Sequence, residues 1–174
     1  GVTTGFGDNV GNAVDPQLAE ELQKNLVRYL HCGTGPSMPQ EAVRAMCVAR
    51  LTSLSRGHSG VSWELLEHLC LLLRHDLLPI VPLEGSLGAS GDLVPLAYLA
   101  EIVQGEGRVM TSTGPRATAE AFAESGIEPY KLKAKEGLSL VNGTSAMTGL
   151  AIVNHIRLRY LLELAQHATA WTCL

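Results

Sequence analysis

Apolar positions recur with a helical period through most of the chain. Leucines follow one another every four residues from Leu18 to Leu30, directly after an Asp15-Pro16 pair that is typical of a helix start. A second apolar stripe begins near Val43 and ends before Gly57. Because such spacing places apolar side chains on one face of a helix, we predict helices over about 16–30 and 37–56.

Two more helices follow, each with a recognisable start. Ser62 precedes the sequence WELLEHLCLLLRHDLL, whose wide apolar face indicates burial between neighbouring elements. Pro79 and Pro82 close that segment, because proline interrupts the hydrogen bonding of a helix. Asp92 stands before the next apolar series and is predicted to cap a helix that ends at Gly105.

The last third of the chain is predicted to contain one short and one long helix. The sequence RVMTSTG fits a small hairpin or loop, and a short helix is expected over about 117–124. From Thr144 onward the chain is apolar on nearly all sides, which is typical of a helix inside a bundle or at a subunit interface. The whole pattern predicts an all-α fold with at most one small hairpin.

Composition and charge exclude several classes of protein. Apolar residues make up 46% of the 174 positions and charged residues 17%, which suits a single domain with a sizeable core. The net charge is −4 and the basic residues form no run, so we expect no nucleic-acid partner. No apolar stretch reaches the roughly 20 residues of a membrane span, so we expect no membrane partner.

Cysteine and histidine spacing gives no sign of a metal site. The four cysteines show no CxxC pair, and the histidines lack the spacing of metal ligands. We therefore expect no metal, and free thiols in a reducing cytoplasm. The chain begins without methionine and ends inside an apolar run without a glycine or proline stop, so we expect a fragment of a longer protein.

A glycine-rich segment, EGSLGASGD at residues 84–92, interrupts the helical pattern and is the strongest candidate for chemistry. A nucleophile elbow would need glycine two residues after Ser90, where the chain has Asp92. A phosphate-binding loop would need a lysine that this segment lacks. Two interpretations remain open: a flexible loop that packs closely and caps a helix, or a tripeptide that modifies itself.

The tripeptide Ala89-Ser90-Gly91 has the composition that backbone cyclisation requires. Because Gly91 has no side chain, its amide nitrogen can approach the carbonyl carbon of Ala89. Loss of water from Ser90 then leaves an alkene outside the new ring. The product, a methylidene-imidazolone, is an electrophile that no ordinary side chain supplies.

Three segments together resemble the histidine and aromatic amino-acid ammonia-lyase family. They are GVTTGFGDNVG at the start, the Ala-Ser-Gly segment, and KEGLSLVNGTSAMTG at residues 135–149. The resemblance implies a helical bundle domain of the ammonia-lyase (fumarase/aspartase-like) type. It further implies that residues 1–174 are a fragment of the N-terminal domain that bears the prosthetic group, continuing into the first long helix of the central bundle at about 144–174. The full-length protein would then be a homotetramer with sites shared between subunits, and the fragment alone would be inactive.

The same resemblance implies roles for individual residues. Ala89, Ser90 and Gly91 would form the methylidene-imidazolone autocatalytically, and Asn142 would contact this group and the substrate. The family's base is a tyrosine directly before the first glycine of the opening motif, so the chain would begin one residue too late to contain it. Gly5 would belong to a mobile lid that lines the substrate cleft.

Further substrate-contacting positions are implied, although ordinary structural explanations stay open. Leu93 matches a residue beside the aromatic ring of the substrate but could equally be a core leucine, and Asn142 could be a plain turn former. The selectivity position reads Tyr29-Leu30, where the family has Ser-His for histidine, His-Leu for tyrosine and Phe-Leu for phenylalanine. Leu30 argues against an imidazole substrate, because an apolar wall leaves the ring nitrogens without partners. Tyr29 matches none of the three patterns and leaves phenylalanine and tyrosine open.

The leading hypothesis is an aromatic amino-acid ammonia-lyase that removes ammonia from phenylalanine or tyrosine and releases an arylacrylate. A 2,3-aminomutase of the same family would use the same prosthetic group and return the amine to the β-carbon. The third alternative is a catalytically silent assembly module, which the intact tripeptide and Asn142 disfavour.

Overall fold

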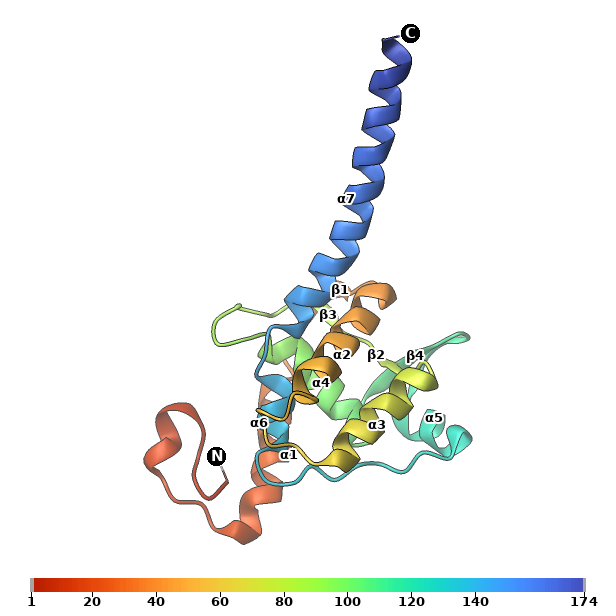
Figure 1. The fold of residues 1–174 in the computed structure, drawn as a ribbon. Helices are drawn as coiled ribbons and strands as arrows, with labels where there is room; N and C mark the ends of the chain where they lie inside the picture. The colour runs from red at the N-terminus through yellow and green to blue at the C-terminus, as the bar shows by residue number, and fades with distance from the viewer. Residues whose placement is uncertain (1, 174) are drawn as a thin grey trace.

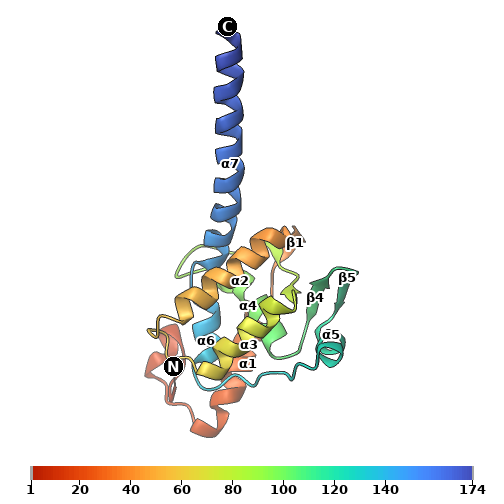
Figure 2. The ribbon, with the colours of Figure 1, turned by 45° about the vertical axis from the view of Figure 1, so that its right-hand side comes forward.

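Helices form most of the structure, and short strands lie in the connections between them (Figures 1 and 2). The computed structural model describes residues 2–173, so Gly1 and Leu174, the ends of the predicted fragment, lie outside the described residues. Two 3-10 turns, η1 (Gly7–Gly11) and η2 (Pro16–Leu18), precede the first α-helix. The α-helices are α1 (Ala19–Leu30), α2 (Gln40–Leu54), α3 (Trp63–Arg74), α4 (Leu93–Val103), α5 (Thr118–Ser125), α6 (Glu136–Val141) and α7 (Ser145–Thr172).

The strands form two small antiparallel sheets where the sequence predicted at most one hairpin. Their bounds are β1 (Thr34–Ser37), β2 (Leu78–Pro79), β3 (Pro82–Glu84), β4 (Arg108–Thr111) and β5 (Gly114–Ala117). The predicted hairpin is β4–β5, and β2 joins it on the other side of β4, while β1 pairs with β3. The mostly helical class is confirmed. Strands β1, β2 and β3 have two to four residues each, too few for an alternating pattern to be recognisable.

The buried face of α1 differs from the predicted leucine stripe. Leu18 is exposed, whereas Ala19, Gln23, Val27 and Leu30 are buried. The buried residues Ala19, Gln23 and Val27 keep the four-residue spacing but stand one position after Leu18, Leu22 and Leu26. One position corresponds to about 100° around the helix, so the face that meets the core is turned from the predicted stripe. Gln23 enters the core with its side-chain nitrogen donating to the Ala19 carbonyl at 3.2 Å.

Helix α4 lies at the centre of the core. Eight of its eleven residues are buried, among them Leu96, Leu99 and Ile102, as its apolar series predicted. It packs against α1, α6 and β2, and its N-terminal end meets the start of α7. The residues at its start are therefore held by neighbours from distant parts of the chain.

Helices α2 and α7 cross closely, and α7 then extends beyond the rest of the molecule (Figure 1). At the crossing, a Cβ atom added to Gly149 would lie 2.6 Å from the Met46 nitrogen and 2.7 Å from the Ala42 oxygen. Arg157 and Glu41 form an ion pair of 2.7 Å between the same two helices. Within residues 2–173, no helix is long and apolar enough to span a membrane.

Candidate functional site

The glycine-rich segment forms the loop between β3 and α4, beside the start of α7 (Figure 1). Its outer part is solvent-exposed, while Gly91 and Asp92 are buried. Ser90 and Gly91 both have left-handed backbone angles, with φ of +58° and +123°. Such angles are uncommon for serine, and they turn the backbone sharply at this tripeptide.

The turn at Asn142-Gly143 holds this loop from the opposite side. The side-chain nitrogen of Asn142 donates a hydrogen bond to the Ser90 carbonyl, and the Asp92 amide donates to the Gly143 carbonyl at 2.7 Å. A Cβ atom added to Gly91 would lie 2.8 Å from the Gly143 nitrogen. Ser90 and Asn142 are separated by 52 positions in the sequence. The fold therefore brings two distant motifs into direct contact.

Asp92 occupies the cap position of α4, as predicted, but the prediction that its side chain caps this helix was wrong. The carboxylate accepts a hydrogen bond from the Met147 amide at 2.9 Å, in the first turn of α7. It also accepts from the Ser86 hydroxyl at 3.0 Å, within the glycine-rich loop. The N-terminal end of a helix carries a partial positive charge that favours a carboxylate. Asp92 thus ties the loop to α7 and not to its own helix.

A buried arginine, which the sequence analysis missed, lies behind the Asn142 turn. Arg50 of α2 is 4% exposed, and its guanidinium donates to the carbonyls of Ser139 and Asn142. Burial lowers the pKa of this guanidinium. The only signal in the sequence was a charged residue inside the apolar stripe between Cys47 and Leu54.

The residues around the tripeptide fit the formation of a methylidene-imidazolone. Ring closure requires close approach of backbone atoms at Gly91, and Gly143 fills the space that a side chain at this position would need. The Asn142 amide gives the Ser90 carbonyl a hydrogen-bond donor. The bonds of Asp92 hold the residue that follows the tripeptide in place.

The other predicted substrate positions, Leu93, Leu30 and Tyr29, differ in how deeply they are buried. Leu93 is the first residue of α4 and is partly buried against the core. Leu30 is buried at the end of α1, whereas Tyr29 is 82% exposed. The segment just after this pair touches the base of the loop, because a Cβ atom on Gly85 would lie 3.1 Å from the Cα of Gly33.

Gly5 is not brought to the tripeptide in this chain. It lies in an N-terminal loop that closes on itself, with its amide donating to the Asn12 carbonyl at 3.0 Å and the Val14 amide donating to the Thr3 carbonyl at 2.8 Å. Figure 1 shows this loop, in red, well separated from the glycine-rich loop.

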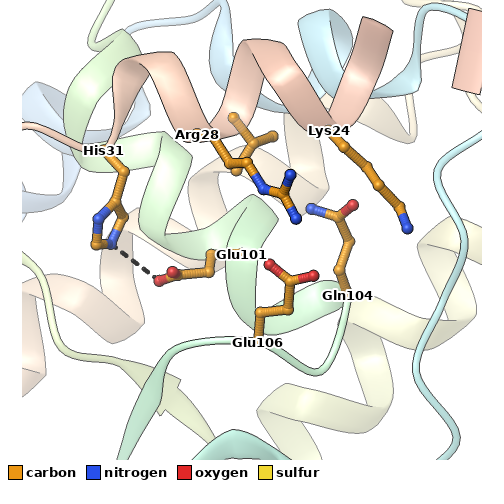
Figure 3. Close-up of a pocket in the computed structure, with 7 residues that line it drawn as sticks. Lys24, Arg28, His31, Glu101, Gln104 and Glu106 are labelled. Carbon is orange, nitrogen blue, oxygen red and sulfur yellow. Dashed lines mark ion pairs between the residues drawn. The ribbon is translucent and has the colours of Figure 1, made fainter. Parts of the chain in front are cut away.

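A polar cavity of about 160 Å³ lies between α1 and the C-terminal end of α4, at the end opposite Asp92 (Figure 3). His31 there pairs with Glu101 at 2.9 Å, and its ring contacts that of Tyr98 at a tilt of 41°, with ring centres 4.0 Å apart. Burial raises the pKa of Glu101, and the nearby His31 acts in the opposite direction. The Gly33 amide donates to the Tyr98 hydroxyl at 3.1 Å, so the chain after Tyr29-Leu30 is anchored to α4.

Comparison with known proteins agrees with the resemblance seen in the sequence. Residues 1–174 match the model of the aromatic amino acid lyase family. The tyrosine 2,3-aminomutase of Myxococcus fulvus is 46% identical over 170 residues, which cover 98% of this chain and 32% of that protein. The tyrosine ammonia-lyase of Cupriavidus metallidurans is 47% identical over 167 residues, which cover 95% of this chain and 31% of that protein.

Solved structures show the same fold. The phenylalanine aminomutase of Pantoea agglomerans superposes with a TM-score of 0.89 at 36% identity, covering 95% of this chain and 32% of that one. The tyrosine aminomutase of Streptomyces globisporus gives a TM-score of 0.80 at 47% identity, covering 86% and 28%. The chain thus spans about a third of the length of the relatives it matches. By its sequence and its fold, the chain belongs to the aromatic amino acid lyase family.

Proposed function

We propose that the full-length protein eliminates the amino group of an aromatic amino acid and releases an arylacrylate. The observation that carries this proposal is the seating of Ala89-Ser90-Gly91 on the Asn142-Gly143 turn, with left-handed backbone angles at Ser90 and Gly91. A loop that only capped a helix would not need these angles together with such close backbone packing. A catalytically silent assembly module would not require this arrangement, so the arrangement favours an enzyme.

The reaction removes a weakly acidic proton and expels a poor leaving group. The methylidene-imidazolone supplies an electrophile that improves the amine as a leaving group. Asn142 donates a hydrogen bond to the Ser90 carbonyl and so stabilises negative charge that develops on this oxygen. Asp92 and Gly143 hold the tripeptide rigidly, which preserves the geometry of that hydrogen bond.

A base must remove the proton, and two tyrosines of this chain are poor candidates. The Tyr98 hydroxyl accepts from the Gly33 amide, and the Tyr130 hydroxyl bonds to Ser62 at 2.8 Å and to Glu136 at 3.0 Å. Burial raises the pKa of both phenols, which disfavours the phenolate. We assign the role of the base to neither of them.

An aromatic substrate and a homotetramer belong to the same proposal. The apolar Leu30 argues against histidine, and the relatives named above include tyrosine enzymes and a phenylalanine aminomutase. Apolar side chains exposed along α7 support assembly with further subunits. They include Ile156, Leu158, Leu161, Leu162 and Leu164. The cytoplasmic location expected from the sequence remains a prediction.

A 2,3-aminomutase is the second candidate. It is favoured by the aminomutases among the similar proteins, from Myxococcus fulvus, Streptomyces globisporus and Pantoea agglomerans. Both reactions begin with the same elimination, so they use the same residues of this chain. They differ in whether ammonia is returned to the β-carbon before the product leaves.

The decisive experiment incubates the purified full-length protein separately with phenylalanine, tyrosine and histidine. We expect an arylacrylate from phenylalanine or tyrosine, and an intact mass lower than that of the sequence by two waters. A β-amino acid as the main product would assign the aminomutase instead. No product from any of the three, with an unshifted mass, would contradict the proposal.

Substitution of Ser90 provides the matched control. Ser90→Ala removes the hydroxyl that is lost as water, so we expect the mass shift to change and the activity to fall by at least about 100-fold. Ser112→Ala, at the exposed turn of the β4–β5 hairpin, should leave both unchanged. Equal activity of Ser90→Ala and the wild type would contradict the role of the prosthetic group.

A further inference from the structure

Arg50 is a buried cation whose position calls for an explanation. It is 4% exposed, and within residues 2–173 no carboxylate lies within ion-pair distance of its guanidinium. Its Nε atom is buried without a hydrogen-bond partner among the described residues. Burying a charge without an ion partner is costly, and an apolar residue of similar size would avoid this cost.

The hydrogen bonds of Arg50 are directed at one short stretch of backbone. The guanidinium donates to the Ser139 carbonyl in the last turn of α6 and to the Asn142 carbonyl at 3.2 Å. Carbonyls at the C-terminal end of a helix lack partners within the helix and carry a partial negative charge, so a cation is favourable there. The hydrogen bonds of Arg50 therefore lie where the chain leaves α6, directly at Asn142.

The same guanidinium packs against Gly143. The three heavy atoms nearest to a Cβ atom added at Gly143 all belong to the Arg50 guanidinium, and the closest would be well inside van der Waals contact. Gly143 in turn lies against Gly91, and its carbonyl accepts from the Asp92 amide. The Asn142-Gly143 peptide is therefore held between Arg50 on α2 and the Gly91 backbone.

We propose that Arg50 is a positioning residue, which fixes the Asn142-Gly143 turn so that the Asn142 amide is aimed at the Ser90 carbonyl. Among residues 2–173, no hydrogen bond joins Arg50 to the tripeptide, so its effect on the tripeptide is transmitted through Asn142 and Gly143. This inference rests on the proposed function, because it assigns a task around the same site. It makes a specific prediction: the consequence of removing Arg50 depends on whether Asn142 is present.

The test is a double-mutant cycle in the full-length protein. Arg50→Met, Arg50→Lys and Asn142→Ala are prepared singly, and each Arg50 variant is combined with Asn142→Ala. Each protein is examined for kcat and KM with its aromatic substrate, and for the fraction of chains that have lost two waters. Arg44→Met is the control, because Arg44 lies on the same helix but is exposed and pairs with Asp76 at 2.6 Å.

We expect Arg50→Met to lower kcat by about 10- to 100-fold with KM changed less than about threefold, because a displaced donor weakens the reaction more than the binding of substrate. Arg50→Lys, which keeps the charge and one directed donor, should recover part of this loss. In the Asn142→Ala background, adding Arg50→Met should lower kcat by a further factor of less than about two. The reason is that the effects of substitutions at coupled residues are not additive. The fraction of chains that have lost two waters should fall together with kcat in Arg50→Met, and it should stay at the wild-type value in Arg44→Met.

Two results would overturn the inference while leaving the proposed function standing. One is a wild-type kcat in Arg50→Met. The other is an equal loss of kcat on removing Arg50 with and without Asn142, which would indicate general support of the fold. If Arg50→Met does not fold, the same comparison is made with Arg50→Lys. A wild-type protein with an unshifted mass and no product would instead defeat both the proposed function and this inference.

Discussion

At position 91 the chain requires a glycine for two separate reasons. The φ angle of +123° is one that side chains rarely allow, and the space for a Cβ atom is occupied by Gly143. The first reason is local to the backbone, and the second depends on the fold. Their contributions can be separated by experiment, because Gly114 shares the angle without the crowding.

Gly91→Ala in the full-length protein should lower the free energy of unfolding by about 1–3 kcal/mol and leave the intact mass without the loss of two waters. At Gly114, φ is +113° and the space around a new methyl group is open, so in Gly114→Ala only backbone strain should lower the free energy of unfolding. Urea unfolding and mass spectrometry of both variants measure the difference. A normal loss of two waters in Gly91→Ala would contradict the packing argument.

We expect His68 of α3 to make the stability of the protein depend on pH. Burial lowers the pKa of this histidine, although its hydrogen bond to the Val103 backbone acts in the opposite direction. The unfolded chain therefore binds a proton on this side chain at a higher pH than the folded chain does. As the pH falls through about 6.5, proton uptake by His68 stabilises the unfolded state more than the folded state. The free energy of unfolding therefore decreases.

We expect His68→Gln to show a smaller loss of stability than the wild type between about pH 7.5 and about pH 5.5. The measurement is urea unfolding of the full-length protein at both values of pH. His75→Gln, at the exposed C-terminal end of α3, is the control. A pH dependence that is unchanged in His68→Gln would rule out this histidine as its source.

At the residue scale, the sequence could single out the Ala-Ser-Gly tripeptide and Asn142 as candidates, because both belong to short contiguous motifs. The reactivity of the tripeptide stays a prediction. It did not predict Arg50, since nothing in the sequence near an arginine tells which distant carbonyls it will meet. It also assigned the Asp92 side chain to the helix that follows it, whereas the carboxylate bonds to Met147, 55 positions away.

At the scale of elements, the crossing of α2 and α7 depends on one glycine. Gly149 lies in a long helix, where alanine would ordinarily be better by about 1 kcal/mol. The fold reverses this preference, because the added methyl group would meet the backbone of Met46 and Ala42. The two helices would have to move apart, and with them Arg50 and the start of α7.

Gly149→Ala should therefore destabilise the full-length protein, by about 1–3 kcal/mol despite its better helix propensity. Gly11→Ala, at a glycine with open space and no left-handed angle, should change the free energy of unfolding by less than about 0.5 kcal/mol. Equilibrium unfolding in urea compares the two variants. A more stable Gly149→Ala protein would show that the helices do not approach this closely.

The long helices could be predicted from their period, and short elements could not. Helix α6 has six residues and starts from a left-handed Lys135, so neither its length nor its cap marks it in the sequence. Its formation depends on tertiary contacts instead. The buried Glu136 accepts hydrogen bonds from the Ser62 amide at 2.9 Å and from the Lys133 amide at 2.7 Å.

At the scale of the whole molecule, no other element of residues 2–173 covers the exposed part of α7 (Figure 2). Its apolar side chains are arranged on nearly all sides of the helix, as the sequence predicted for a bundle or interface helix. Trp171, near its end, is 78% exposed. In the full-length protein, this surface is expected to be buried by further helices of the assembly.

Leu161→Asp should weaken the assembly of the full-length protein by placing a charge where apolar contacts are expected. Size-exclusion chromatography with light scattering should show a smaller particle than the wild type at the same concentration. Gln166→Asp is the control, because this position is already polar. A wild-type particle size for Leu161→Asp would argue against α7 as an assembly helix.

By itself, the sequence determined the helical period, the long final helix and the Ala-Ser-Gly tripeptide for which we propose cyclisation. These features depend on residues within a few positions of one another, so they are present before the chain folds. Only the tertiary structure decided which groups meet the tripeptide, namely Asn142 at the Ser90 carbonyl and Gly143 against Gly91. It also placed Arg50, which does not meet the tripeptide, on the carbonyl of Asn142. The physical reason is that buried polar groups must find partners, and the available partners are set by which distant segments the core brings together.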